Sequence, residues 1–463
     1  AGHKEGSPVD AYDATCFHQG YTGDVYCQVC GELLSQGEYT AMIDHTPMEE
    51  RVYASVPTCA REGYTGSVYC ENCGERLEEG EVVPMIEHPL GDPENVVEAA
   101  CDRNGYTGDR TCAMCGEVFE GEELPALEHA YGEDGICADC GYKRPGLYID
   151  GKLSMDWETL VSEGYAVVED EELVDLQDAL YGTIVVSDDL KRIDDYVFYG
   201  SNFTEIWIPW SIQNAGEMEF RGSPVLETVR FFCQSTQTPG FYDCPALKHV
   251  DLPEGIERVT NSSFGACVAL TELDLGDSVK TIEYSAFWGC TALTSINLPE
   301  GLETIDESAF RETAIREFVA PASLSYLGES VFRDCPNLTR VDLSACTVDR
   351  IRDNTFSNSA ALNEVILPDT LTYLQGGFNN CASLKSIVLP EGVTAAGARF
   401  EGCTALETLV WPVSLKEIES SFLCDSELTG HLTILYRGDA LRWSLINGVD
   451  RLAEFSVTMD YQD

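Results

Sequence analysis

Three cysteines and one histidine recur together three times in the first third of the chain. The copies are Cys16, Cys27, Cys30 and His45; Cys59, Cys70, Cys73 and His88; and Cys101, Cys112, Cys115 and His129. Glycine follows each Cys-x-x-Cys pair and lets two backbone N–H groups turn toward a thiolate. Three thiolates and one imidazole complete a tetrahedral zinc site and leave no position for substrate. The spacing predicts three structural zinc sites.

The spacing leaves open which histidine belongs to which cysteines, because a histidine also precedes each first cysteine. The alternative sets are His3, Cys16, Cys27 and Cys30; His45, Cys59, Cys70 and Cys73; and His88, Cys101, Cys112 and Cys115. That assignment leaves His129 to join Cys137 and Cys140 in a set that lacks one ligand. We favour the histidine as the last ligand, because each repeat then closes its own loop.

Disulfide bonds are a competing interpretation of these cysteines. Each repeat contributes three cysteines, so pairing inside a repeat leaves one thiol over. Repeats of about 43 residues also have small cores, and a bound metal would supply much of their folding free energy. Zinc, or another soft divalent metal, is therefore favoured over disulfides.

The same repeats contain a Gly-Tyr-Thr-Gly turn between their first two cysteines, at 20–23, 63–66 and 105–108. With the Cys-x-x-Cys-Gly element, they resemble the cysteine/histidine repeats found beside leucine-rich arrays in secreted proteins of anaerobic Gram-positive bacteria. Those repeats are thought to be small zinc-ribbon-like β modules. The resemblance implies a spacer or presentation role for this part of the chain.

A phenylalanine recurs about every 22 residues through the rest of the chain. The positions are Phe198, Phe220, Phe241, Phe264, Phe287, Phe310, Phe332, Phe356, Phe378, Phe400 and Phe422. So regular a period is typical of a solenoid, in which each small unit buries its apolar face against its neighbours. A solenoid presents a long surface, which favours binding over catalysis.

Each phenylalanine leads a fixed series of residues. A small residue, usually cysteine, follows three places later, as Cys267 and Cys290 show. A Leu-x-x-Ile-x-Leu-Pro run then predicts a short strand that ends at a residue without a backbone donor. Stacked strands of this kind form a parallel sheet along one face. We expect the cysteines of this series to be small buried side chains packed in a column.

The series resembles the BspA-like (Treponema-type) leucine-rich repeats, in which Leu-x-x-Ile-x-Leu-Pro alternates with Ile-x-x-x-Ala-Phe-x-x-Cys. The stretch TIEYSAFWGCTALTSINLPEGLETIDESAF carries both elements, and the resemblance covers about residues 185–430. It implies a bacterial protein, from an anaerobic Gram-positive species by the first resemblance, that is secreted or displayed at the cell surface. Characterised proteins of that family tend to be adhesins.

These patterns predict a repeat solenoid, mainly β, preceded by tandem zinc-stapled β modules. The modules occupy residues 1–146, divided at about 1–47, 48–90 and 91–146. An N-terminal cap with one short helix follows at 147–190, and the leucine-rich solenoid spans 191–430. The C-terminal cap occupies 431–463, with a short helix at 440–446 and a final strand, because an uncapped stack would expose its apolar core.

The outward-facing strand positions fall eight and ten residues after each phenylalanine. There Ile366, Val388 and Val410 form an apolar stripe over three adjacent strands, and exposed stripes often mark contact sites. Trp207, beside Trp210 in the first coil, is a second candidate contact residue. The alternatives are that β-branched residues simply suit strands, that a loop covers the stripe, and that the tryptophans pack against the cap.

The chain carries 80 acidic and 28 basic residues, a formal charge of −52. Such a field repels phosphate backbones and anionic lipids, which disfavours nucleic acid and membrane partners. No apolar run approaches the roughly 20 residues of a membrane helix, and no catalytic motif stands out. We expect a non-enzymatic binding or adhesion protein whose partner is a protein or a glycan. The alternative is a structural component of a larger extracellular assembly.

Overall fold

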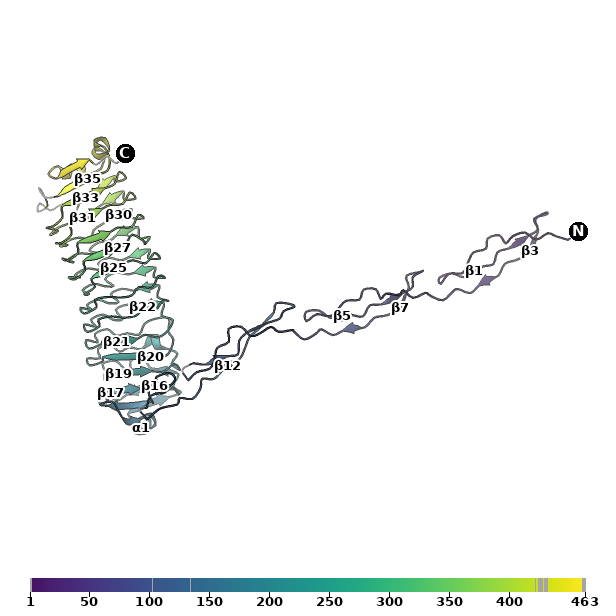
Figure 1. Ribbon diagram of the computed structural model, residues 1–463, viewed down its shortest axis with the longest axis horizontal. Helices are drawn as coiled ribbons and strands as arrows, with labels where there is room; N and C mark the ends of the chain where they lie inside the picture. Colours follow the sequence, from purple (N-terminus) through teal and green to yellow (C-terminus); the bar gives the residue numbers. More distant parts are fainter. Residues whose placement is uncertain are drawn as a thin grey trace. The chain divides into compact units, whose positions relative to one another are not determined.

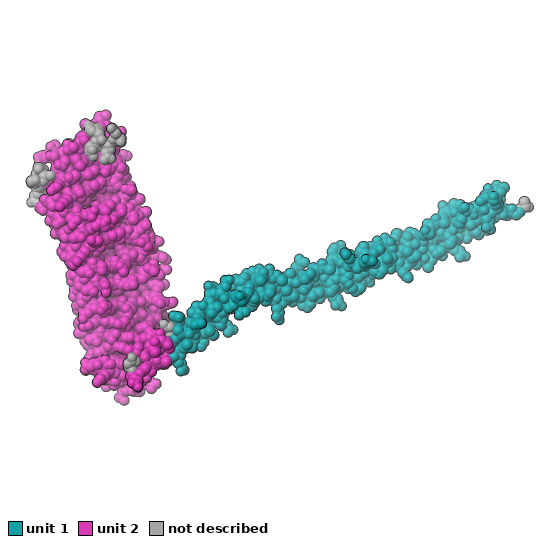
Figure 2. Space-filling model, viewed as in Figure 1, with its two compact units in different colours: residues 1–128 teal, residues 129–463 magenta. Residues whose placement is uncertain are grey.

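The structure is a computed structural model that describes residues 2–101, 103–133, 135–420, 422–423, 428 and 432–459. The chain divides into two compact units, residues 1–128 and 129–463 (Figure 2). This boundary lies earlier than the expected one at 146. Residues 129–146, which the repeat spacing assigned to the first part, pack within the second unit.

The first unit consists of three similar modules, each a long hairpin with two short antiparallel strand pairs. In the first module β1 (Gly20–Tyr21) pairs with β4 (Tyr39–Thr40) and β2 (Val25–Tyr26) with β3 (Leu33–Ser35). In the second, β5 (Gly63–Tyr64) pairs with β8 (Val82–Val83) and β6 (Val68–Tyr69) with β7 (Arg76–Glu78). In the third, β9 (Gly105–Tyr106) pairs with β12 (Glu123–Leu124) and β10 (Arg110–Thr111) with β11 (Val118–Phe119).

These modules have almost no apolar core. Among the described residues of the first unit, the buried ones are cysteines, the glycines of the Gly-Tyr-Thr-Gly turns, and Ser67. Large apolar side chains such as Val29, Tyr53 and Val56 are exposed. Because apolar burial is the main driving force of folding, another interaction must stabilise these modules.

The second unit is a solenoid of stacked coils with two columns of short parallel strands (Figure 1). The first column contains β17 (Tyr181–Val185), β19 (Asn202–Ile208), β20 (Thr228–Phe231), β21 (His249–Asp251), β25 (Glu317–Val319), β27 (Arg340–Asp342), β29 (Glu364–Ile366), β31 (Ser386–Val388), β33 (Thr408–Trp411), β35 (Thr433–Tyr436) and β36 (Ser456–Met459). The second contains β18 (Arg192–Ile193), β22 (Arg258–Val259), β23 (Thr281–Ile282), β24 (Thr304–Ile305), β26 (Tyr326–Leu327), β28 (Arg350–Ile351), β30 (Tyr373–Leu374), β32 (Ala395–Ala396) and β34 (Glu417–Ile418). The expected solenoid is confirmed.

The periodic phenylalanines form a continuous column in the core of the solenoid. All are buried, and the rings of Phe264, Phe287 and Phe310 stack with centroid separations of 5.4 and 5.3 Å. Backbone hydrogen bonds also pass from coil to coil: Phe264 N–H donates to the carbonyl of Ala286, and Phe287 N–H to that of Ala309. Each coil therefore depends on the next for both its apolar contacts and its backbone partners.

The cysteine three places after most of these phenylalanines is a hydrogen-bond donor rather than simple apolar filling. Cys290 Sγ lies 3.0 Å from the carbonyl oxygen of Phe264, one coil earlier, and Cys267 Sγ lies 3.1 Å from that of Phe241. Ser359 takes the same place, and its Oγ donates to the carbonyl of Phe332 at 2.8 Å. The expected buried column exists, but a donor group is what its cysteine and serine members share.

Both ends of the solenoid carry caps. At the start, β13 (Gly146–Ile149) pairs with β14 (Lys152–Asp156), β15 (Ala166–Glu169) with β16 (Glu172–Leu176), and α1 (Trp157–Ser162) lies between the two hairpins. A 3-10 turn, η1 (Ala215–Glu217), interrupts an early coil. At the other end, α2 (Ala440–Ser444) and the turn η3 (Val449–Leu452) precede β36. The short helices and the final strand occur within the expected cap segments.

The hydrogen bond from Cys290 predicts that serine and alanine at this position have different effects on stability. Cys290→Ala removes one of the two donors to the buried Phe264 carbonyl, the other being the N–H of Cys267. Loss of that hydrogen bond should lower the free energy of unfolding by about 0.5–1.5 kcal/mol. Cys290→Ser keeps a donor and should cost less. Urea unfolding monitored by circular dichroism measures both variants. Equal losses in the two would show that the position contributes packing alone.

Candidate metal centres and binding face

The thiol and imidazole groups of the first unit form two complete clusters of four. In the first, Cys16 Sγ lies 3.6 Å from Cys70 Sγ, and Cys73 Sγ lies 3.4 Å from His45 Nδ1. All four ligand atoms lie within 4.8 Å of one another. In the structure each module begins at its histidine, so the three modules are residues 3–43, 45–86 and 88–127. The cluster therefore draws on two modules, because Cys16 lies in the first and the other three residues lie in the second.

The second cluster repeats this arrangement one module further along. Cys59 Sγ lies 3.6 Å from Cys112 Sγ, and Cys115 Sγ lies 3.4 Å from His88 Nδ1. Again the four ligand atoms lie within 4.8 Å of one another, and the first cysteine comes from the preceding module. The repetition of both distances shows that the composition of the cluster follows from the module fold.

The described structure groups the ligands differently from either assignment made on the sequence. Cys27 and Cys30 lie with His3, not with Cys16 or His45. Cys112 and Cys115 lie with Cys59 and His88, so they form no set with Cys101 and His129. The physical reason is that each hairpin holds its first cysteine at one end and its Cys-x-x-Cys pair at the other.

The remaining expected ligands lie at the two ends of the cysteine-rich segment. His3 Nδ1 lies 3.4 Å from Cys30 Sγ, beside Cys27, near the start of the chain. Cys101 is buried within the first unit. In the second unit, His129 lies with Cys137 and Cys140, and its Nδ1 is 3.4 Å from Cys140 Sγ.

The two complete clusters have the dimensions of a metal site. Tetrahedral zinc, with bonds of about 2.3 Å to sulfur and 2.0–2.1 Å to nitrogen, sets sulfur–sulfur separations of about 3.8 Å and sulfur–nitrogen separations of about 3.6 Å. The observed 3.6 and 3.4 Å are close to both. Met114 N–H points at Cys112 Sγ at 3.4 Å, and Gly116 has a φ of 75° with open space where a Cβ would stand. The backbone therefore directs an N–H group at the thiol, as a metal knuckle requires.

The cluster thiols differ in their readiness to ionise. Burial raises the pKa of the Cys16 thiol to about 12, with further contributions from Cys73 and Cys70. Burial also opposes ionisation of Cys70, but the N–H groups of Asn72 and Cys73 outweigh it and lower that pKa to about 6. A divalent cation would stabilise every thiolate of the set, and its binding would release protons.

Each histidine has a carboxylate behind it that the sequence analysis missed. His45 Nε2 lies 3.2 Å from the Glu75 carboxylate, while its Nδ1 faces Cys73. Glu32 and Glu117 take the same place behind His3 and His88, at 3.7 and 3.5 Å. A carboxylate fixes the tautomer of a metal-binding imidazole and makes it a better ligand. The available signal was the glutamate that directly follows Cys-x-x-Cys-Gly in all three copies.

In the second unit, Trp207 does not belong to the exposed face. It is 7% exposed and packs in a cluster with Tyr142, Tyr148 and Val185. Tyr142, two residues after Cys140, is fully buried and donates its hydroxyl hydrogen to the carbonyl of Val186. Tyr142 thus covers the first coils, and Trp207 packs inside the second unit, which corrects its expected place on the exposed face and agrees with the alternative that the tryptophans are packing residues.

The apolar stripe on the first strand column lies at the surface. Val388 is 46% exposed, whereas Ile366 and Val410 are half-buried. Val388 is in register with Val410. Ile366 ends the sheet β25-β27-β29, and Val388 begins the sheet β31-β33-β35-β36. A hollow of about 630 Å³ lies where these two sheets meet. Ile366 and Val388 line it, together with the charged residues Glu364, Asp369, Glu391 and Arg437.

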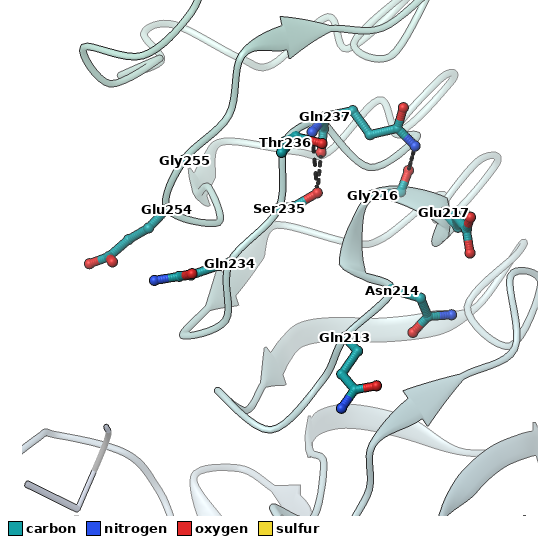
Figure 3. A pocket seen from close by; sticks show the side chains of 10 residues that line it. All are labelled: Gln213, Asn214, Gly216, Glu217, Gln234, Ser235, Thr236, Gln237, Glu254 and Gly255. Carbon is teal, nitrogen blue, oxygen red and sulfur yellow. Dashed lines mark hydrogen bonds between the residues drawn. The ribbon is translucent and has the colours of Figure 1, made fainter. Parts of the chain in front are cut away.

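A second hollow, of about 490 Å³, lies beside η1 and is lined by polar residues (Figure 3). Its side chains are mostly amides and hydroxyls: Gln213, Asn214, Gln234, Ser235, Thr236 and Gln237, with Glu217 and Glu254. Ser235 Oγ donates to the carbonyl of Gln237, and Gln237 Nε2 to that of Gly216. Neutral hydrogen-bonding side chains of this kind suit a hydroxyl-rich ligand.

A stack of coils with a phenylalanine column and two strand ladders defines a leucine-rich repeat solenoid. The family model described as "BspA type Leucine rich repeat region (6 copies)" matches residues 179–292, 233–339 and 326–435, together more than half of the chain. The chain therefore belongs to the BspA-type leucine-rich repeat family. Such repeat proteins are generally non-enzymatic binding proteins, and this family is typically extracellular or at the cell surface. A search of the curated proteins found no match.

Solved structures of bacterial leucine-rich repeat proteins are similar to this chain. A leucine-rich repeat protein from Bacteroides ovatus is 22% identical over 64% of this chain and 91% of its own, with a TM-score of 0.43. A leucine rich cell surface protein from Faecalibacterium prausnitzii is 19% identical over 61% and 95%, with a TM-score of 0.27. The pneumococcal vaccine antigen PcpA is 16% identical over 64% and 96%, with a TM-score of 0.32.

The helices of the described residues are short. None of them has the length and apolar character needed to cross a membrane.

The carboxylate behind His45 can be tested by metal titration. Glu75→Gln removes the charge that faces Nε2 and should weaken metal binding at that cluster by about 10–100-fold. Competition with a chromophoric chelator measures the loss. Glu78→Gln is the matched control, because Glu78 pairs with Arg51 instead. Equal losses in the two variants would remove Glu75 from the site.

Proposed function

We propose that this chain is a non-enzymatic binding or adhesion protein, secreted or displayed at a cell surface, whose solenoid contacts a protein or glycan partner. The observation that carries the proposal is the hollow at the junction of β29 and β31. There an exposed apolar residue, Val388, lies among Glu364, Asp369 and Glu391. Glu364 pairs with Arg340 and Glu391 with Arg437, so the rim consists largely of ion pairs. An apolar centre within a charged rim suits a protein contact.

The first unit acts as a zinc-dependent spacer in this proposal. Its described residues bury thiols and glycines in place of an apolar core, and the thiols gather with histidines at tetrahedral spacing. A set of four protein ligands leaves no open coordination position, so the metal would be structural. Metal binding would then supply the folding free energy that apolar burial does not.

Chelation should separate the two units in their stability. Removal of metal with a strong chelator should unfold residues before about 128, while the solenoid keeps its strand signal, because the phenylalanine column contains no metal ligand. Circular dichroism with limited proteolysis of the intact chain measures both events. Readdition of zinc should restore resistance to proteolysis in the first unit. Loss of both units in a single transition would contradict this independence.

The binding face can be tested by substitution at its exposed centre. Val388→Asp places a charge in the hollow and should weaken binding of a protein ligand, found by screening the intact chain against protein and glycan arrays, by at least about tenfold. Gln234→Ala tests the polar hollow in the same assay. Val268→Asp is the control, since Val268 is equally exposed but lies in the turn after Phe264.

Unchanged affinity in both Val388→Asp and Gln234→Ala would move the contact to another part of the solenoid. Absence of any ligand in both arrays, with the protein folded and metal-loaded, would contradict the binding function itself.

A further inference from the structure

We propose that each metal ion of the two complete clusters is a joint between consecutive modules: Cys16 closes the site of His45, Cys70 and Cys73, and Cys59 closes that of His88, Cys112 and Cys115. The inference rests on the proposed zinc binding and adds its architecture. In a site of this kind no module holds a complete ligand set, and each borrows one thiolate from the module before it.

The path of the chain explains why the first cysteine faces the next module. Cys16 lies in the tight turn at the end of its hairpin, where Thr15 N–H donates to the carbonyl of His18. The returning strand ends at the same turn, because Ile43 N–H donates to the carbonyl of Thr15 at 3.3 Å. His45 follows two residues later, so the link to the second module starts beside Cys16.

The second module then presents its Cys-x-x-Cys pair at the link. Glu71 N–H donates to the carbonyl of Thr46, and Met48 N–H to that of Tyr69, which places the knuckle of Cys70 and Cys73 next to His45. The next link repeats these contacts: Ile86 N–H donates to the carbonyl of Thr58 at the turn of the second module, and in the third module Ala113 N–H donates to that of Pro89. Both ends of each link are thus fixed by backbone hydrogen bonds.

Few other interactions pass between the modules. The described hydrogen bonds and ion pairs of residues 3–43 and 45–86 lie inside one module or the other, apart from those of the Cys16 thiol. The same holds between residues 45–86 and 88–127, where the Cys59 thiol reaches Cys112 and Cys115. A metal at each cluster would therefore set the angle between neighbouring modules and keep the spacer stiff.

Thiol alkylation of the intact, zinc-loaded chain distinguishes a joint from a site closed within one repeat. In Cys16→Ser, a joint predicts that Cys70 and Cys73 become reactive toward N-ethylmaleimide while Cys27 and Cys30 react as in the unmodified protein. Tryptic peptides 5–51 and 62–76 carry the two pairs and are resolved by mass spectrometry. Cys59→Ser should expose Cys112 and Cys115 in the same way. Cys267→Ser, in the solenoid, is the control and should expose neither pair.

A second measurement needs no variant and therefore does not depend on how well Cys16→Ser folds. During slow removal of zinc by a competing chelator, the ligands of one ion become reactive together. Cys16 should be alkylated at the same rate as Cys70 and Cys73, and Cys59 at the same rate as Cys112 and Cys115. Zinc content measured in parallel gives the number of ions lost at each stage.

The outcomes separate the joint from the zinc proposal beneath it. The shared site would be contradicted, with zinc binding retained, if Cys27 and Cys30 were alkylated at the same rate as Cys16. Selective alkylation of Cys27 and Cys30 in Cys16→Ser would contradict it in the same way. Reactivity of Cys59 in step with Cys70 and Cys73 would equally overturn it. Full thiol reactivity with no zinc in the purified, zinc-treated chain would remove the metal itself and the joint with it.

Discussion

One constraint governs both units of this protein: a repeat does not complete its own interior, and its neighbour must do so. In the solenoid, Phe264 stacks on Phe287 and accepts a hydrogen bond at its carbonyl from Cys290, one coil further on. In the first unit, the thiol of Cys16 meets the knuckle of the next module. Apolar stacking completes the interior in the solenoid, and we propose that a shared metal ion does so in the first unit. Stability in such arrays is approximately a sum of terms between neighbours.

The functional consequences follow from the same constraint. Coils that satisfy their polar groups toward one another leave a long strand face exposed, and Val388 lies on that face. Where the stack must end, the chain supplies covers: α1 and its hairpins at one end and β36 at the other. Residues 129–145 cover part of the face itself, and Trp207 is buried for that reason. This cover does not reach the later part of the strand column, where Val388 is exposed.

Sequence periodicity predicted the elements inside each repeat but not the contacts between neighbouring repeats. The phenylalanine column, the strands and the Cys-x-x-Cys-Gly knuckles follow from local spacing. The ligand sets did not, because the order of residues does not tell whether Cys16 returns to its own module or reaches the next. The donor role of Cys290 was hidden as well, although serine at position 359 marked it. The role of Glu75 behind His45 could have been predicted, because a glutamate follows Cys-x-x-Cys-Gly in all three copies.

Each repeat is completed by its neighbour, and the positions of the metal ions in the first unit test this most directly. Anomalous diffraction at the zinc absorption edge, on crystals of the zinc-loaded chain, locates the ions directly. The account predicts one peak bounded by Cys16, His45, Cys70 and Cys73, and a second bounded by Cys59, His88, Cys112 and Cys115. A peak enclosed by Cys16, Cys27 and Cys30 within a single repeat would contradict it.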